Sequence, residues 1–387
     1  MSKTERWPGR IALMVAHCAG MVDLVALPVW VGTLISRYRL DPQQAGLLAT
    51  LFLVGAVAAS VALAPLFNRL NGRAVATLGF GIAAALFAAV AQTQDFATMA
   101  ALHALAGLAT GAALSVTHGR IARSGNPHRL FAIVGIALGV FAIVFLGATP
   151  QLVAAAGGPA LFLVFGGVMA VAAVVSLLAF PAADAVAAPA DAARTPAGRM
   201  PAVVWYGIVG IACMGLVQAM TFSFLERVGS DRGFGLQAVT GVLIALGVVN
   251  LFPAVLAALL ERRWAARSVM LAGPVVQALL VAVIMNSPAF APYAAAASVF
   301  AAVMIFTHTF AFGLLAGMDR SGRAMAATPA MLMIGAAIGP ILGGTLVKAF
   351  GYGSLGAAAA VIAVVAVACF AKLPRPGAAA APQEALA

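Results

Sequence analysis

The sequence predicts an all-α integral membrane protein with twelve transmembrane helices, arranged as two similar six-helix bundles. Of its 387 residues, 64% are hydrophobic and 9% are charged, whereas soluble domains carry about 25% charged residues. A chain of this length cannot bury so much apolar surface in water, so we expect lipid to be its solvent. The apolar runs lack the alternation of strands, so the segments that cross the bilayer are predicted to be helices.

Twelve apolar runs are long enough to cross the hydrocarbon core, which takes about 20 helical residues. In the first half they cover 11–35, 44–67, 74–93, 96–119, 130–154 and 158–180. In the second half they cover 202–226, 237–260, 268–287, 290–316, 324–349 and 352–371. No small-residue cleavage site follows the first run, so we interpret it as a retained helix and not as a signal peptide.

The runs divide the chain into two bundles, residues 1–180 and 202–373. Between them, residues 181–201 are rich in Pro, Ala and small polar residues, which is typical of a flexible linker. We expect this linker to be cytoplasmic and the tail 374–387 to be disordered.

The positive charges follow the alternation of the loops. Seventeen of the 22 Lys and Arg residues fall at the termini and in alternate loops, and the other five are Arg37, Arg39, Arg227, Arg232 and Lys348. This positive-inside bias predicts that both termini are cytoplasmic, and it explains the net charge of +11 without a nucleic-acid partner. Ala and Gly are abundant and Arg outnumbers Lys, which suggests a bacterium of high genomic GC content and hence a bacterial inner membrane. We expect a monomer.

The two halves share short stretches of sequence in the same order. "AHCAGMVD" (16–23) aligns with "IACMGLVQ" (211–218), which pairs Asp23 with Gln218. "MAALHALA" (99–106) aligns with "MIFTHTFA" (304–311), which pairs His103 with His308, and "GIALG" (135–139) aligns with "GAAIG" (335–339). The order predicts a six-helix unit present twice, an architecture in which transporters bind substrate between the repeats.

The loop after the second run reads "APLFNRLNGR" (64–73) and contains Asn68, Arg69 and Arg73. It resembles the Gly-x-x-x-Asp-Arg-x-Gly-Arg-Arg signature of the major facilitator superfamily of secondary transporters, although Asn68 replaces the Asp and Ala64 the first Gly. The resemblance covers about residues 8–373. It implies two pseudo-symmetric bundles, a central cavity lined by helices 1, 4, 7 and 10, and transport by alternating access.

A glycine-rich run, "GAAIGPILGG" (335–344), lies in the eleventh helix. It matches a run that is diagnostic of drug–proton antiporters of the superfamily when it lies in helix 5. Glycines four apart let helices approach closely, and a helical proline frees a carbonyl and permits a bend. Tight packing and a hinge therefore both remain possible roles for Gly335, Gly339, Pro340, Gly343 and Gly344.

Asp23 is the only acidic residue near the centre of any span. A charge at that depth costs roughly 2.5–3.5 kcal/mol on insertion scales. We interpret Asp23 as a proton-coupling carboxyl in the cavity; the alternative is a structural carboxyl bonded to a neighbouring helix. Pro28 frees the carbonyl of Leu24 and is expected to bend the helix beside the acid.

Three histidines, His17, His103 and His308, lie in helices 1, 4 and 10. The resemblance places these helices around the cavity, so we predict that the histidines and Gln218 line it and assist Asp23. Each histidine also has a methionine four residues away, namely Met21, Met99 and Met304. Sulfur with imidazole suits Cu(I), so uptake of Cu(I) or another transition metal is an alternative function.

No Lys or Arg lies in the core of any span, which disfavours strongly anionic substrates. The sequence therefore predicts proton-coupled transport of a neutral, weakly polar or cationic small organic solute, with export favoured over metabolite import. We find no cluster of a nucleophile and a base, so we expect neither an enzyme nor a bound cofactor.

Overall fold

The computed structural model describes residues 6–63, 66, 69–181, 202–318 and 323–374. This part of the chain forms fourteen α-helices and contains no strand. Twelve helical spans within it are long and apolar enough to cross a membrane, which confirms the predicted fold class. The linker and the tail expected from the sequence lie almost wholly outside the described residues.

The described residues of the first half form seven helices because the first span is interrupted. They are α1 Trp7–Gly20, α2 Val22–Tyr38, α3 Pro42–Leu63, α4 Gly72–Val90, α5 Phe96–Ala122, α6 Pro127–Ala156 and α7 Pro159–Ala179. Polar loop residues fix three of the starts: the side chains of Asn71, Asp95 and Asn126 accept backbone N–H groups at the N-termini of α4, α5 and α6. Such caps satisfy donors that have no partner within the helix.

The part of the second half that the structure describes also forms seven helices. They are α8 Ala202–Asp231, α9 Leu236–Val249, α10 Pro253–Leu260, α11 Ala266–Asn286, α12 Phe290–Met318, α13 Arg323–Phe350 and α14 Gly353–Ala371. The run 237–260, expected as one helix, is divided between α9 and α10 just before Pro253. Proline has no N–H to bond to the preceding turn but fits the first turn of a new helix.

The first span is interrupted at Met21, and not at the proline that the sequence singled out. Met21 has φ −108° and ψ 11°, outside the helical range, and α2 then continues through Pro28 to Tyr38. The break lies just before Asp23. The bend expected at Pro28, which lies inside α2, stays a prediction.

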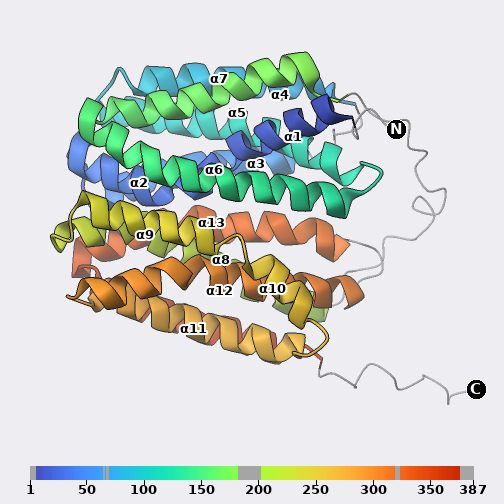
Figure 1. The fold of residues 1–387 in the computed structure, drawn as a ribbon, viewed down its shortest axis with the longest axis vertical. Helices are drawn as coiled ribbons and strands as arrows, with labels where there is room; N and C mark the ends of the chain where they lie inside the picture. Colours follow the sequence, from blue (N-terminus) through green and yellow to red (C-terminus); the bar gives the residue numbers. More distant parts are fainter. Residues whose placement is uncertain (1–5, 64–65, 67–68, 182–201, 319–322, 375–387) are drawn as a thin grey trace, which may run out of the picture.

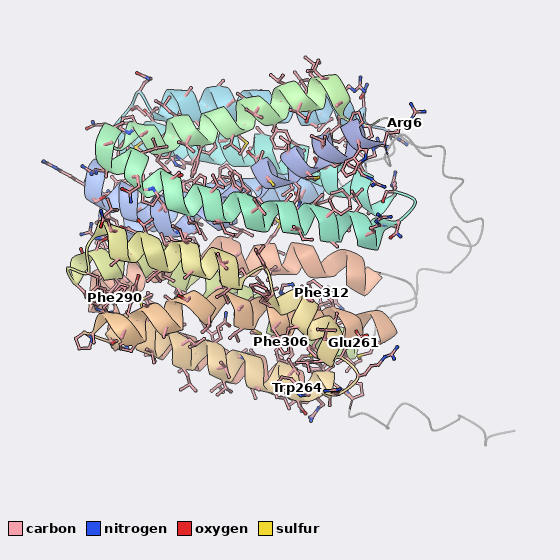
Figure 2. The ribbon with its side chains drawn as sticks, viewed as in Figure 1. Arg6, Glu261, Trp264, Phe290, Phe306 and Phe312 are labelled. Atoms are coloured by element: carbon pink, nitrogen blue, oxygen red, sulfur yellow. The ribbon has the colours of Figure 1, made fainter. Side chains whose placement is uncertain are left out.

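The two halves lie side by side as two layers, α1–α7 above α8–α14 in Figure 1. Across the seam α3 packs along α13, α2 against α8, and α6 against α9. We call the end of the bundle near Arg6, labelled in Figure 2 just before the start of α1, the terminal end. The opposite end holds the turns 39–41 and 351–352.

Candidate functional site

Asp23 lies in the first turn of α2, directly after the break at Met21, and is 2% exposed. Its Oδ1 accepts the backbone N–H of Leu24 at 2.8 Å. A new helix start leaves backbone N–H groups without intrahelical partners, and a carboxyl group there both accepts one and complements the helix dipole. The break and the acid therefore form one local structure.

Within the described part of the chain, the second carboxyl oxygen of Asp23 lacks the hydrogen bond that a buried polar atom normally makes. Oδ2 is buried and has no hydrogen-bond partner among the described residues. A buried charge must be paired or neutralised, because leaving it unpaired costs far more than burying a neutral group. The arrangement can hold a proton on Oδ2, or accept a hydrogen bond from a ligand that reaches it.

His103 lies in the aromatic core of the first half. It is fully buried, and its ring stacks on Trp30 with a centroid separation of 5.5 Å. The edges of Phe87 and Phe162 enclose it at 6.2 and 5.5 Å. Its Nδ1 lies 2.6 Å from the carbonyl oxygen of Met99, and its Nε2 is buried without a partner among the described residues.

His308 repeats this local geometry in the second half. Its Nδ1 lies 3.0 Å from the carbonyl oxygen of Met304, and its ring contacts Phe312 at 4.9 Å; Phe312 is labelled in Figure 2. In the pairs Met99–His103 and Met304–His308 the imidazole Nδ1 thus faces the methionine carbonyl. Within the described residues, no group of three or more His, Cys, Asp and Glu side chains could hold a metal.

Gln218, which the repeat pairs with Asp23, is bonded to another amide. Gln277 of α11 donates to Oε1 of Gln218 at 3.3 Å and to the carbonyl of Met214 at 3.2 Å. Gln277 is 1% exposed and was not singled out from the sequence, although an amide in the middle of the run 268–287 was a detectable signal.

The structure brings His17 together with a histidine to which the sequence assigned no role. Nδ1 of His17 on α1 lies 3.0 Å from Nε2 of His118 on α5. These residues are 101 positions apart, so no local pattern could have paired them.

Of the two arginines in the run 64–73, Arg73 bonds to a distant carbonyl and Arg69 is exposed. Arg73 donates from Nε and Nη2 to the carbonyl of Phe180, at 3.1 and 2.9 Å. Arg69 is exposed, and Asn68 lies outside the described residues. In the second half Arg267 repeats the bond of Arg73, donating to the carbonyls of Leu373 at 3.2 Å and Ala371 at 2.9 Å.

The glycines of α13 lie where backbones meet. A Cβ on Gly335 would overlap the carbonyl of Ala212 on α8, and one on Gly339 would lie 2.6 Å from the nitrogen of Met220. The same face continues through Gly343, where an added Cβ would lie 3.0 Å from the ring of Phe224 on α8.

Two neighbouring positions of α13 face the other half. A Cβ on Gly344 would overlap the carbonyl of Pro42, and one on Gly46 would overlap the carbonyl of Pro340. Beside Pro340, the N–H of Ile341 donates to Oγ1 of Thr50 at 3.1 Å. The motif therefore packs α13 against both α8 and α3.

A cavity of about 750 Å³ lies on the second half, between α9, α10, α11 and α12. Its lining is mainly apolar, with Arg263 and Trp264 near the end of α10. Figure 2 shows Trp264 and Phe306 close together there, and their ring centroids are 5.8 Å apart. None of the predicted site residues lines this cavity, so it is separate from the site around Asp23.

Comparison with solved structures identifies the fold. A bacterial homologue of the human lysosomal transporter Spinster, inward-facing and occupied, matches with a TM-score of 0.72 and 15% identity over 96% of this chain and 95% of that one. The nucleoside transporter NupG matches with 0.69 and 14%, over 94% and 98%. A D-xylose–proton symporter matches with 0.71 and 13%, over 95% and 98%.

Sequence comparison gives the family. No curated protein matches the chain in sequence. The family model described as Major Facilitator Superfamily matches residues 12–318, most of the chain. With the fold and the repeated halves, this match shows that the chain belongs to the Major Facilitator Superfamily, a family of membrane transporters and not of enzymes.

Proposed function

We propose that this transporter moves a small neutral, weakly polar or cationic organic solute across the cytoplasmic membrane, in exchange for protons. Both termini are cytoplasmic in this proposal, and the direction is export. Family membership supports transport by alternating access. The proton coupling and the class of solute rest on the residues discussed next.

The observation that carries the proposal is the unpartnered Oδ2 of buried Asp23. In the enclosed state such a carboxyl is favoured in its neutral, protonated form. Exposure to water on one side of the membrane would let it release the proton, and exposure on the other side would let it reload. The break at Met21 supports this role, because a helix end can reorient the carboxyl without distorting a continuous helix.

The charge distribution supports the class of solute. In the described spans, Arg and Lys side chains lie near helix ends, as with Arg120, Arg227 and Lys348. A transport path that contains an acid and no central cation favours neutral or cationic solutes. Gln218 and His308, both partly buried, are the proposed polar contacts from the second half.

The first experiment identifies a ligand. Purified protein is heated at two pH values with organic cations, neutral aromatics, sugars, nucleosides and weak acids. A ligand at about 100 times its dissociation constant adds about 2.7 kcal/mol of stability, which shifts the unfolding midpoint measurably. The proposal expects an organic cation or a neutral compound among the stabilising ligands, with a pH-dependent shift.

The second experiment tests coupling with that ligand in proteoliposomes under an imposed pH gradient. Exchange predicts accumulation in vesicles that are acidic inside, whereas symport predicts accumulation when the outside is acidic. Asp23→Asn is expected to abolish accumulation while the ligand still stabilises the protein. Asp95→Asn is the matched control, because Asp95 is an exposed cap of α5 and Asn caps helices equally well.

Undiminished pH-driven accumulation by Asp23→Asn would overturn the role of this carboxyl. Accumulation only with an acidic exterior would overturn export in favour of metabolite import.

A further inference from the structure

We infer that His17 and His118 form a binding site for one monovalent d¹⁰ metal ion, Cu(I) or Ag⁺, between α1 and α5. The site is distinct from the Met–His pairs within single helices, and it does not depend on the proposed solute or on Asp23.

The geometry of the two imidazoles is the first argument. Nδ1 of His17 faces Nε2 of His118 at 3.0 Å, and the ring centroids are 5.1 Å apart with planes tilted by 43°. A neutral imidazole has one N–H donor and one acceptor nitrogen, so the facing nitrogens share a single hydrogen. When the donor ring takes its other tautomer, the hydrogen moves to the second nitrogen of that ring and both facing nitrogens carry free lone pairs. A metal ion can then lie between them with both neutral imidazoles as ligands and no net release of a proton.

The required movement is small. Imidazole nitrogen binds metals such as zinc at about 2.0–2.1 Å, so an ion between two such nitrogens sets them about 4 Å apart. The observed separation is 3.0 Å, so side-chain rotation that widens the gap by about 1 Å is sufficient. Both ligands remain on the helices that carry them.

The other described imidazoles are arranged differently. His103 and His308 direct Nδ1 to carbonyls of their own helices. Among the histidine side chains that the structure describes, His17 and His118 are the pair whose ring nitrogens face each other across helices. This difference provides matched control positions on α5 and α12.

The number of ligands selects the ion. Zn²⁺ in proteins takes about four ligands, and the described residues offer no group of three or more His, Cys, Asp and Glu side chains. Cu(I) and Ag⁺ accept two ligands in a line, and imidazole is a suitable donor. A single charge between neutral ligands also costs less to bury than a double charge.

The position of the pair allows an ion to enter. His17 is 7% exposed, whereas His118 is half-buried and lies in the last part of α5, which ends at Ala122. Phe131 of α6 borders the imidazole of His118 at 5.9 Å. An ion would arrive from the terminal end of the bundle and link α1 to α5 just before the break at Met21.

The test uses Ag⁺, added as nitrate in chloride-free buffer, with the full-length protein. Thiols also bind Ag⁺, so the parent for all variants carries Cys18→Ala, Cys213→Ala and Cys369→Ala; these three cysteines are free. Calorimetric titration is expected to show one ion per chain, and the ion is expected to raise the unfolding midpoint.

His17→Gln and His118→Gln are each expected to lose that binding, whereas His103→Gln and His308→Gln are expected to keep it. Unchanged binding in both His17→Gln and His118→Gln, or no binding by the cysteine-free parent, would overturn the proposal. X-ray absorption of the Ag⁺-loaded parent needs no histidine variant: two nitrogen ligands support the site, and a sulfur shell overturns it.

Discussion

Lys348 of α13 donates to Oδ2 of Asp41 at 2.9 Å and so joins the two halves at the opposite end of the bundle. Oδ1 of the same carboxylate accepts the backbone N–H of Gln44 at 2.9 Å. Asp41 therefore starts α3 and holds α13 at the same time. The pair lies beside Gly344, where α13 meets the backbone of Pro42.

The first prediction concerns pH. Partial burial disfavours the charged form of Asp41, but the N–H of Gln44 and the Lys348 ammonium outweigh it and lower the pKa of Asp41. A carboxyl with a lowered pKa stabilises the fold above its unfolded pKa of about 3.9, and this contribution is lost as pH falls through the folded value. Asp41→Asn keeps a residue that can cap the helix, but it removes this contribution of the carboxylate to stability.

We expect Asp41→Asn to lower the free energy of unfolding by about 0.2–1 kcal/mol near neutral pH, the range of exposed ion pairs. The difference from the parent should stay constant down to about pH 5 and shrink below about pH 4. Unfolding midpoints in detergent across this range measure it. A difference that widens toward acid would contradict the assignment.

The second prediction concerns the contact between α3 and α13. Gly46→Ala places a methyl group on the carbonyl of Pro340, and overpacking of this kind typically costs about 1–3 kcal/mol. Gly135→Ala and Gly167→Ala are matched controls, because nothing lies within 4 Å of a Cβ at either position.

Cysteines are introduced into α3 and α13 where the two helices lie at the opposite end of the bundle. Their cross-linking should fall in Gly46→Ala and stay at the parental level in the two controls. Equal cross-linking in all three variants would show that the close approach is not required.

The third prediction concerns the arginine bonds. Arg73→Met and Arg267→Met each remove a charged donor from carbonyls at the end of the last helix of its half, Phe180 for Arg73 and Ala371 and Leu373 for Arg267. We expect each change to cost about 1.5 kcal/mol, the lower end for hydrogen bonds to charged groups. The two losses should add, because the bonds lie in different halves and share no partner.

Arg69→Met, an exposed change four residues before Arg73, should leave the unfolding midpoint unchanged. A loss for Arg69→Met as large as that for Arg73→Met would indicate that loop charge, and not the bond to Phe180, sets the effect.

The fourth prediction separates packing from coupling at His103. His103→Leu removes an unpartnered buried nitrogen and keeps an apolar contact with Trp30, so we expect a change in stability within about 1.5 kcal/mol. His103→Lys should unfold the first half, because it buries an unpaired charge. Coupled transport by a well-folded His103→Leu variant would assign this histidine to the core. Loss of coupled transport by that variant would assign His103 to the proton pathway.

Much of the fold could be predicted because lipid imposes simple rules. The number of spans follows from the length of the apolar runs, and the repeated His103 and His308 positions follow from aligned sequence. The structure gives both histidines the same Nδ1-to-carbonyl geometry.

The details of the site could not be predicted, because they depend on contacts that local sequence does not encode. The break at Met21 is stabilised by the Asp23 side chain, which no proline or glycine rule anticipates. The pairing of His17 with His118 depends on how α1 and α5 pack. The resemblance placed helix 4 at the cavity, yet it could not tell which face of that helix carries His103.

The bonds of Arg73 and Arg267 have a consequence for biogenesis. Each joins the start of the third span of its half to the end of the sixth, and neither needs a residue of the other half. The first half can therefore close on itself while the ribosome is still translating the second. The seam around Gly46 and Gly344 would then be the last contact to form, as the docking of two finished bundles within the bilayer.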